Sequence, residues 1–214
     1  MVKDNRFLFN QKGREQLKTE LAEEGFARKT CSFYRYINID EPQALRDELY
    51  KEWFALRILG RVYLAAEGIN AQISVPEPHW DQFLETLNSR GVLAKMPLKH
   101  AVQEGQSFFK LAIRVKQELV AYNIPFNQYD MNHVGEQLNA VEFNEALDNP
   151  DSIAVDMRNY YESEVGQFKT AIIPDVETSR DLLPQVRHLL KGQEEKEVLL
   201  YCTGGIRCEK ASAY

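Results

Sequence analysis

The spacing of apolar residues in the first half of the chain predicts the element order β-α-β-β-α-β. Strand-like runs alternate apolar and polar residues, whereas helix-like runs repeat large apolar residues every three or four positions. The runs are, in order, a strand at 31–39, a helix at 41–60, strands at 61–65 and 69–75, a helix at 79–91, and closing runs at 98–103 and 108–115. This order is typical of a ferredoxin-like sandwich. We therefore expect an α+β ferredoxin-like domain over residues 28–120, after a helical lead-in at 1–27.

The second half alternates helices and strands in a way that indicates an α/β layer. Residues 121–140 show no clear period and are interpreted as a connection before a second domain at 141–214. The predicted elements are helices at 141–150 and 181–192, strands at 152–157, 170–174 and 197–201, and a helix-compatible run at 208–213. The run at 197–201 (EVLLY) is continuously apolar after its first residue, which favours a parallel strand covered on both faces.

Charge and composition narrow the class of protein without naming its function. Residues 1–135 carry 18 Lys and Arg against 17 Asp and Glu, a net charge of +1, and residues 136–214 carry 8 against 15, a net charge of −7. This balance neither supports nor excludes an RNA partner. The sequence shows neither a long apolar run nor a signal-peptide core, and three cysteines do not make a disulfide framework. We therefore expect a cytoplasmic protein that is not bound to a membrane, and no protein partner can be deduced.

The most informative stretch follows the apolar strand at 197–201. Cys202 comes directly after that strand, and a short loop leads to the next helix. The loop residues are Thr203, Gly204, Gly205, Ile206 and Arg207. Two glycines let the backbone curl with its amides inward, and the next helix adds its positive N-terminal end. We therefore predict an anion-binding loop that lowers the pKa of the Cys202 thiol below its free value of about 8.5, with Arg207 as a positive charge at the rim.

Other chemistries use similar parts and fit the spacing less well. A cysteine phosphatase places five residues between its cysteine and arginine, whereas four separate Cys202 from Arg207, which makes a smaller ring. No CxxC or HxxxH pair accompanies the loop, so we expect no metal site. No histidine has a protease-like motif around it. A buried structural cysteine is the remaining alternative, although the position at a strand end before Gly-Gly argues for a reactive thiol.

Two stretches together resemble a rhodanese domain. DMRNYYESEVGQF at 156–168 is followed by YCTGGIRCEKA at 201–211. In the rhodanese pattern, the polar residues corresponding to Asp156, Arg158 and Glu162 lie near the active loop. Two roles are open for these three residues: direct participation in the chemistry, or a buried ion-pair and capping network. The two roles are compatible with each other. A complete rhodanese domain continues with further strand and helix, so we interpret the chain as a piece of a longer protein.

Two stretches of the first half, FYRYINI and RVYLAAEGINAQISVP, extend the resemblance. Together with the two rhodanese-like stretches, they make the chain from about residue 30 resemble the bacterial tRNA uridine hydroxylase family. The resemblance implies oxygen-dependent 5-hydroxylation of the wobble uridine 34 of tRNA, with Cys202 as the essential cysteine. The resemblance also implies molecular oxygen as co-substrate and prephenate as a required metabolite. The sequence itself contains no evident cofactor-binding motif. The residues alone leave two alternatives open: a sulfurtransferase that forms a cysteine persulfide, and a non-enzymatic RNA-binding module.

Several residues of the first half are candidates for RNA contact. Tyr34 and Tyr36 share one face of their strand and could stack bases, whereas Phe33 is expected in the core. Four basic residues are candidates for phosphate contact or simply solvated strand positions: Arg61, Lys99, Lys110 and Arg114. Cys31 is expected to be a small buried residue, and Cys208 is expected to pack in a helix, with a resolving thiol as the alternative.

Overall fold

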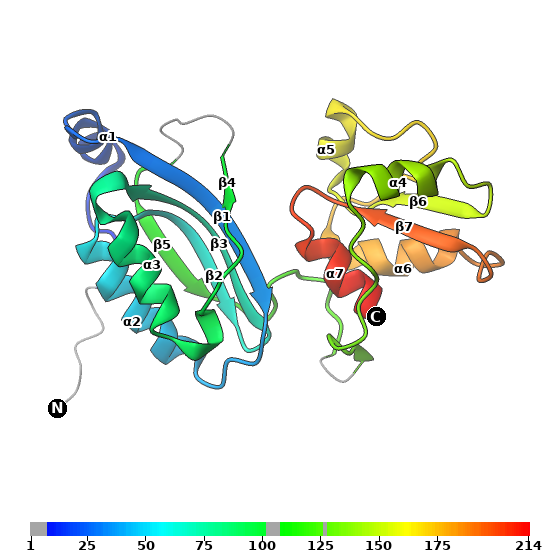
Figure 1. The fold of residues 1–214 in the computed structure, drawn as a ribbon, viewed down its shortest axis with the longest axis horizontal. Helices are drawn as coiled ribbons and strands as arrows, with labels where there is room; N and C mark the ends of the chain where they lie inside the picture. Colours follow the sequence, from blue (N-terminus) through cyan, green and yellow to red (C-terminus); the bar gives the residue numbers. More distant parts are fainter. Residues whose placement is uncertain (1–7, 102–107, 126–127) are drawn as a thin grey trace. The chain divides into compact units, whose positions relative to one another are not determined.

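A computed structural model describes residues 8–101, 108–125 and 128–214 of the chain. The chain divides into two compact units, unit 1 at residues 1–119 and unit 2 at residues 120–214 (Figure 1). Within the described ranges, none of the helices is long and apolar enough to cross a membrane. The first seven residues of the predicted lead-in lie outside the described ranges, as do 102–103 of the predicted run at 98–103.

Unit 1 is a five-stranded sheet with two helices on one face. The strands are β1 (Arg28–Tyr36), β2 (Leu59–Ala65), β3 (Gly68–Pro76), β4 (Lys99–His100) and β5 (Leu111–Val115), and the helices are α2 (Pro42–Ala55) and α3 (Trp80–Asn88). The strand order is β4-β1-β3-β2-β5, with β5 parallel to β2 and every other pair antiparallel. The predicted β-α-β-β-α-β order is therefore confirmed, and β5 adds an edge strand.

Alternation along the strands builds the core of unit 1. Phe33 and its same-face neighbours in β1, β2 and β3 point to the helices, where Trp53 and Phe83 are fully buried. The three rings pack with centroids 5.7 to 6.4 Å apart. Helix α3 presents Phe83 and Leu87 to this core, as its apolar spacing predicts. The opposite faces of the same strands carry polar and aromatic residues.

Helix α2 ends earlier than the spacing predicts. It stops at Ala55 because Arg57 adopts φ 57°, a left-handed conformation that no α-helix continues through. The chain then enters β2 at Leu59. The lead-in contributes one helix, α1 (Arg14–Ala22), and Glu24 just after it pairs with Arg28 at the start of β1, 2.6 Å apart. These residues fix the lead-in at the end of the sheet where β1 begins.

Unit 2 is a small parallel sheet surrounded by short helices. Strand β6 (Ser152–Asp156) pairs with β7 (Glu197–Tyr201) in parallel. The helices are α4 (Ala140–Leu147), α5 (Tyr160–Val165), α6 (Ser179–Leu189) and α7 (Ile206–Ala213). Asn139 caps α4 by accepting hydrogen bonds from two backbone amides, and α6 buries Leu182, Leu183 and Val186. The carboxyl ends of both strands point to the same edge, where α5 and α7 begin.

Two predicted strands of the second half differ from the structure. Residues 170–174 form only a single bridge, Ile172 to Val155, because a longer parallel ladder would need an N–H that Pro174 lacks. Strand β7 is not covered on both faces, since Val198 is 38% exposed and only Leu199 is buried. The predicted connection at 121–140 packs with unit 2 at its start, where residues 120, 122 and 124 enter the core.

Candidate active site

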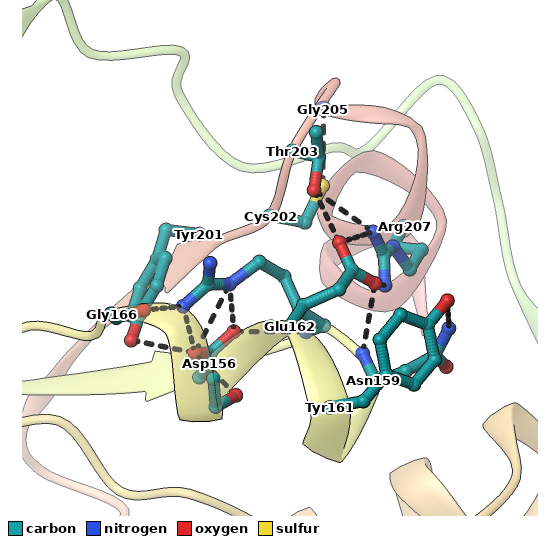
Figure 2. Close-up of polar contacts among 12 residues, drawn as sticks. Asp156, Asn159, Tyr161, Glu162, Gly166, Tyr201, Cys202, Thr203, Gly205 and Arg207 are labelled. Carbon is teal, nitrogen blue, oxygen red and sulfur yellow. Dashed lines mark hydrogen bonds and ion pairs between the residues drawn. The ribbon is translucent and has the colours of Figure 1, made fainter.

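The loop after β7 turns sharply around the sulfur of Cys202. Cys202 follows the last residue of the strand, and α7 begins four positions later at Ile206. Gly205 makes the turn with φ 94°, in the left-handed region that favours glycine. This conformation directs the Gly205 N–H to the Cys202 Sγ at 3.1 Å, as Figure 2 shows.

Hydrogen bonds to the sulfur lower the pKa of Cys202 to about 5. The largest cause is a hydrogen bond from the Cys208 thiol, and burial opposes it by raising the pKa. Backbone amides of Cys208, Gly204 and Arg207 lower the pKa further. The direction agrees with the one that the loop sequence predicts, although the largest cause is a side chain of α7.

Cys208 packs in a helix, which is the first of the two roles expected from the sequence. It lies in the first turn of α7 and packs against the core of unit 2. Its thiol also contacts the Cys202 sulfur, and this hydrogen bond together with burial raises the pKa of Cys208. At neutral pH the pair therefore consists of one thiolate and one thiol, the arrangement in which one sulfur attacks and the other donates a proton.

Glu162 connects α5 to the loop. Its carboxylate accepts hydrogen bonds from Arg207 at 2.7 and 3.0 Å and from the Thr203 hydroxyl (Figure 2). The same carboxylate accepts from the backbone N–H of Asn159 and so completes the cap of α5. Burial raises the pKa of Glu162, but the hydrogen bonds from Arg207 and Thr203 outweigh it and bring the pKa to about 2.

The ion pair with Glu162 adds to the expected role of Arg207. The sequence predicts a positive charge at the loop rim, and the structure shows that this guanidinium is paired and that its side chain is only 15% exposed. Glu162 is its hydrogen-bonded partner. Burial lowers the pKa of Arg207, but the charges of Glu162 and Cys202 both raise it. Arg207 fixes the loop through its side chain, and its backbone N–H contributes to the lowered pKa of Cys202.

Asp156 and Arg158 form a second network beneath the loop. The Asp156 carboxylate is fully buried and accepts hydrogen bonds from Arg158, from the Ser163 hydroxyl at 2.9 Å and from the Tyr201 hydroxyl at 2.8 Å. Burial raises the pKa of Asp156, but the hydrogen bonds from Arg158, Tyr201 and Ser163 outweigh burial and lower that pKa. These contacts join the ends of β6 and β7 to α5. Asp156 and Arg158 thus position the strand end from which Cys202 projects.

Two further residues of unit 2, which the sequence did not single out, make contacts that support the loop. The Tyr122 hydroxyl donates to the Arg207 carbonyl at 3.0 Å, and burial raises the pKa of that phenol. Lys210 of α7 is fully buried, donates to the Val120 carbonyl at 3.2 Å and lies over the Tyr129 ring. Residues 119–140 show no period, so only the folded chain shows that their first part supports the loop.

The predicted RNA-contact residues Tyr34 and Tyr36 belong to unit 1, on the sheet face opposite α2 and α3. In unit 2, the loop brings together Cys202, Cys208, Thr203, Arg207 and Glu162. Over the described residues, no three or more His, Cys, Asp or Glu side chains group so that they could hold a metal ion. The arrangement holds a thiolate beside a thiol, which suits nucleophilic or thiol redox chemistry.

Fold and site together define a protein with an acylphosphatase-like α+β unit and a small parallel unit that carries a thiolate loop. Residues 28–119 match the UPF0176 acylphosphatase like domain. The chain is similar to proteins named tRNA uridine(34) hydroxylase: 47% identical over 208 residues to that of Leptospira interrogans, 46% over 209 to that of Hamiltonella defensa, and 44% over 209 to that of Escherichia fergusonii.

These matches cover both units, because each includes 97% of the chain. The chain is therefore homologous to proteins named tRNA uridine(34) hydroxylase over nearly its whole length. It spans 57 to 60% of the length of these curated relatives.

Proposed function

We propose that this protein acts in the oxygen-dependent 5-hydroxylation of uridine 34 in tRNA, with Cys202 as its reacting residue. The observation that carries the proposal is identity of 43 to 47% to tRNA uridine(34) hydroxylases over 97% of the chain. That span includes the loop of unit 2, which we propose is rhodanese-like. A pKa of about 5 keeps Cys202 ionised at neutral pH, so its sulfur is available as a nucleophile or electron donor.

The overall reaction needs two reducing equivalents besides oxygen. One oxygen atom of O₂ replaces the C5–H bond of uridine by C5–OH, and the other leaves as water after taking up two electrons and two protons. A pair of thiols supplies both when it is oxidised to a disulfide. Cys208 contacts the Cys202 sulfur, so we propose that this pair is the source, and that an external thiol then reduces the disulfide.

Molecular oxygen is the co-substrate of this proposal. The family resemblance also suggests prephenate, which carries two carboxylates and would need cationic partners. The two arginines near the loop, Arg158 and Arg207, are already paired with Asp156 and Glu162. We therefore assign prephenate no site at these four residues, and none of the proposed steps involves it.

The decisive test replaces Cys202 in the gene that encodes this chain. The strain to use is one in which deletion of the gene removes 5-hydroxyuridine from position 34, measured by nucleoside mass spectrometry of tRNA. We expect Cys202→Ala to match the deletion and Cys31→Ala, which alters a thiol in the core of unit 1, to retain the modification. Full modification in the Cys202→Ala strain would exclude the cysteine mechanism. A deletion that leaves the modification intact in every strain tested would exclude the function itself.

A sulfurtransferase is the second candidate, favoured by the several backbone amides that face the Cys202 sulfur. It requires Cys202 to attack thiosulfate and retain one sulfur atom as a persulfide while sulfite leaves. Mass spectrometry of the chain after treatment with thiosulfate distinguishes the two functions. A gain of one sulfur atom on Cys202, with transfer to cyanide, would favour sulfur transfer, and an unmodified Cys202 would favour hydroxylation.

A further inference from the structure

The sheet of unit 1 has two faces of different chemistry. Cys31 and Phe33 of β1 point to α2 and α3, so the alternate positions of that strand point to the other face. The strand pairing aligns these positions across the sheet, and we call the resulting surface the polar face. Its central residues are Ser32, Tyr34, Tyr36, Arg61, Tyr63, Asn70, Gln72, Lys99 and Arg114.

All the charged side chains on the strands of unit 1 are basic. The five strands contain six Lys and Arg residues and neither Asp nor Glu. Arg61, Lys99 and Arg114 lie on the polar face, and all three are exposed. Lys116 follows β5 and lies over the Tyr63 ring, 5.3 Å from its centroid. The local surface is therefore cationic although the chain as a whole carries a net charge of −6.

Aromatic rings and amides fill the space between these cations. Tyr34 and Tyr63 flank Asn70 in one cross-strand row, because both pair with it. Two strand spacings separate them, about 10 Å. Tyr36 lies beside Tyr34 with ring centroids 6.2 Å apart, and Lys99 lies over the Tyr34 ring at 6.0 Å. A half-buried tyrosine on an open sheet offers a flat ring to a base, and an amide between two rings can hydrogen-bond a base edge.

We propose that the polar face of unit 1 binds single-stranded RNA, with Tyr34, Tyr36 and Tyr63 as stacking platforms. Arg61, Arg114, Lys99 and Lys116 contact the phosphates around them. Single-stranded RNA is the partner that matches all three features, since it presents unstacked bases, free base edges and a phosphate backbone. An acidic protein would use the cations but not the rings. The identification of the RNA as a tRNA loop rests on the proposed function.

The test measures binding of a fluorescent tRNA anticodon stem-loop to the 214-residue chain by fluorescence anisotropy. Stacking of a base on an aromatic ring is worth about 1–3 kcal/mol, which converts to a loss of about 5- to 150-fold in affinity. We expect Tyr34→Leu and Tyr63→Leu each to weaken binding by at least about fivefold. Tyr34→Phe and Tyr63→Phe retain the ring and should bind as the wild type does.

The matched control is Phe54→Leu, which changes a ring that is 60% exposed on α2, on the other side of the sheet. It should leave binding unchanged. The affinity for RNA falls as the salt concentration rises. Arg61→Gln and Arg114→Gln should each make the plot of log affinity against log salt less steep by about 0.7, because each removes one phosphate contact. Lys51→Gln on α2 should leave the steepness unchanged. Circular dichroism confirms that each variant is folded.

Binding that is insensitive to both leucine substitutions would overturn the proposal. A second outcome would also overturn it: the chain binds heparin as tightly as RNA, and the tyrosine variants do not weaken either interaction. That result would describe a surface that binds any polyanion. The strain assay distinguishes failure of this proposal from failure of the proposed function. If Tyr34→Leu weakens RNA binding but deletion of the gene leaves 5-hydroxyuridine intact, the RNA-binding surface stands and the hydroxylase function is excluded.

Discussion

Units 1 and 2 each place a cysteine on or beside a strand, and the two thiols have opposite properties. Cys31 lies in the middle of β1, is 1% exposed, and burial raises its pKa to about 12. Cys202 lies one residue beyond the end of β7, and hydrogen bonds lower its pKa to about 5 despite burial. Burial alone therefore does not decide whether the pKa of a thiol is raised or lowered, because hydrogen bonds to the sulfur can outweigh it.

The difference comes from where the backbone amides are directed. Within the sheet of unit 1, β3 and β4 pair with β1 on its two sides, and the Cys31 side chain packs into the hydrophobic core. Beyond β7 the chain has left the ladder, and the Gly205 amide turns to the Cys202 sulfur. The first turn of α7 adds the Cys208 thiol. A strand end followed by a glycine turn and a helix therefore supplies donors that a strand interior cannot.

The largest expected effect is the difference in reactivity between these two thiols. At pH 7 a pKa of about 5 leaves Cys202 almost fully ionised, whereas a pKa of about 12 leaves Cys31 ionised to roughly one part in 10⁵. Brief treatment with iodoacetamide followed by peptide mass spectrometry should label Cys202 and not Cys31. Labelling of Cys202 should decline as the pH falls below about 5. Comparable labelling of the two thiols in the folded chain would break the comparison.

Packing dominates unit 1, so the next largest effect is on its stability. Phe83 is fully buried among Phe33, Trp53 and Trp80, and Phe83→Ala should lower the free energy of unfolding by about 3–5 kcal/mol. The control Phe54→Ala alters an exposed ring and should cost less than about 0.5 kcal/mol. Urea denaturation of both variants measures this. A loss for Phe83→Ala no larger than that of the control would contradict the description of the core.

Cys208 separates a positioning role from a redox role. A hydrogen bond to a charged group is worth about 1.5–3 kcal/mol, so Cys208→Ala should raise the pKa of Cys202 by roughly one to two pH units. Cys208→Ser retains a donor but cannot form a disulfide. It should leave the pKa of Cys202 near that of the wild type and abolish hydroxylation in the strain assay. Hydroxylation at the wild-type level with serine at this position would exclude the dithiol as electron source.

The smallest expected effect tests the turn itself. Gly205 has φ 94°, where a side chain is strained, and Gly205→Ala should cost about 1–2 kcal/mol and raise the pKa of Cys202. Gly204 has open space around its Cα, and Gly204→Ala should be tolerated. Thermal denaturation compares the two. Equal stability of the two variants would show that the conformation of Gly205 does not hold the loop.

Local patterns account for what the sequence could predict. Alternation and helical spacing give the order of elements in unit 1, and the end of an apolar strand before Gly-Gly gives the position of Cys202. Contacts between distant segments could not be predicted, because no local pattern encodes them. The Glu162–Arg207 pair joins residues 45 positions apart, and Tyr122 reaches the loop from 85 positions away. The Cys208 contact depends on where α7 begins, which the sequence places only to within a residue or two.

Direct titration of Cys202 tests the central claim, that the loop of unit 2 holds this sulfur as a thiolate. The measurement follows thiolate absorbance against pH in the 214-residue chain and subtracts the same titration of Cys202→Ala. The account predicts a difference curve that rises with a midpoint near pH 5 and has reached its plateau by neutral pH. A midpoint near the free value of about 8.5 would contradict it, because the loop would then provide no stabilisation for the charged sulfur.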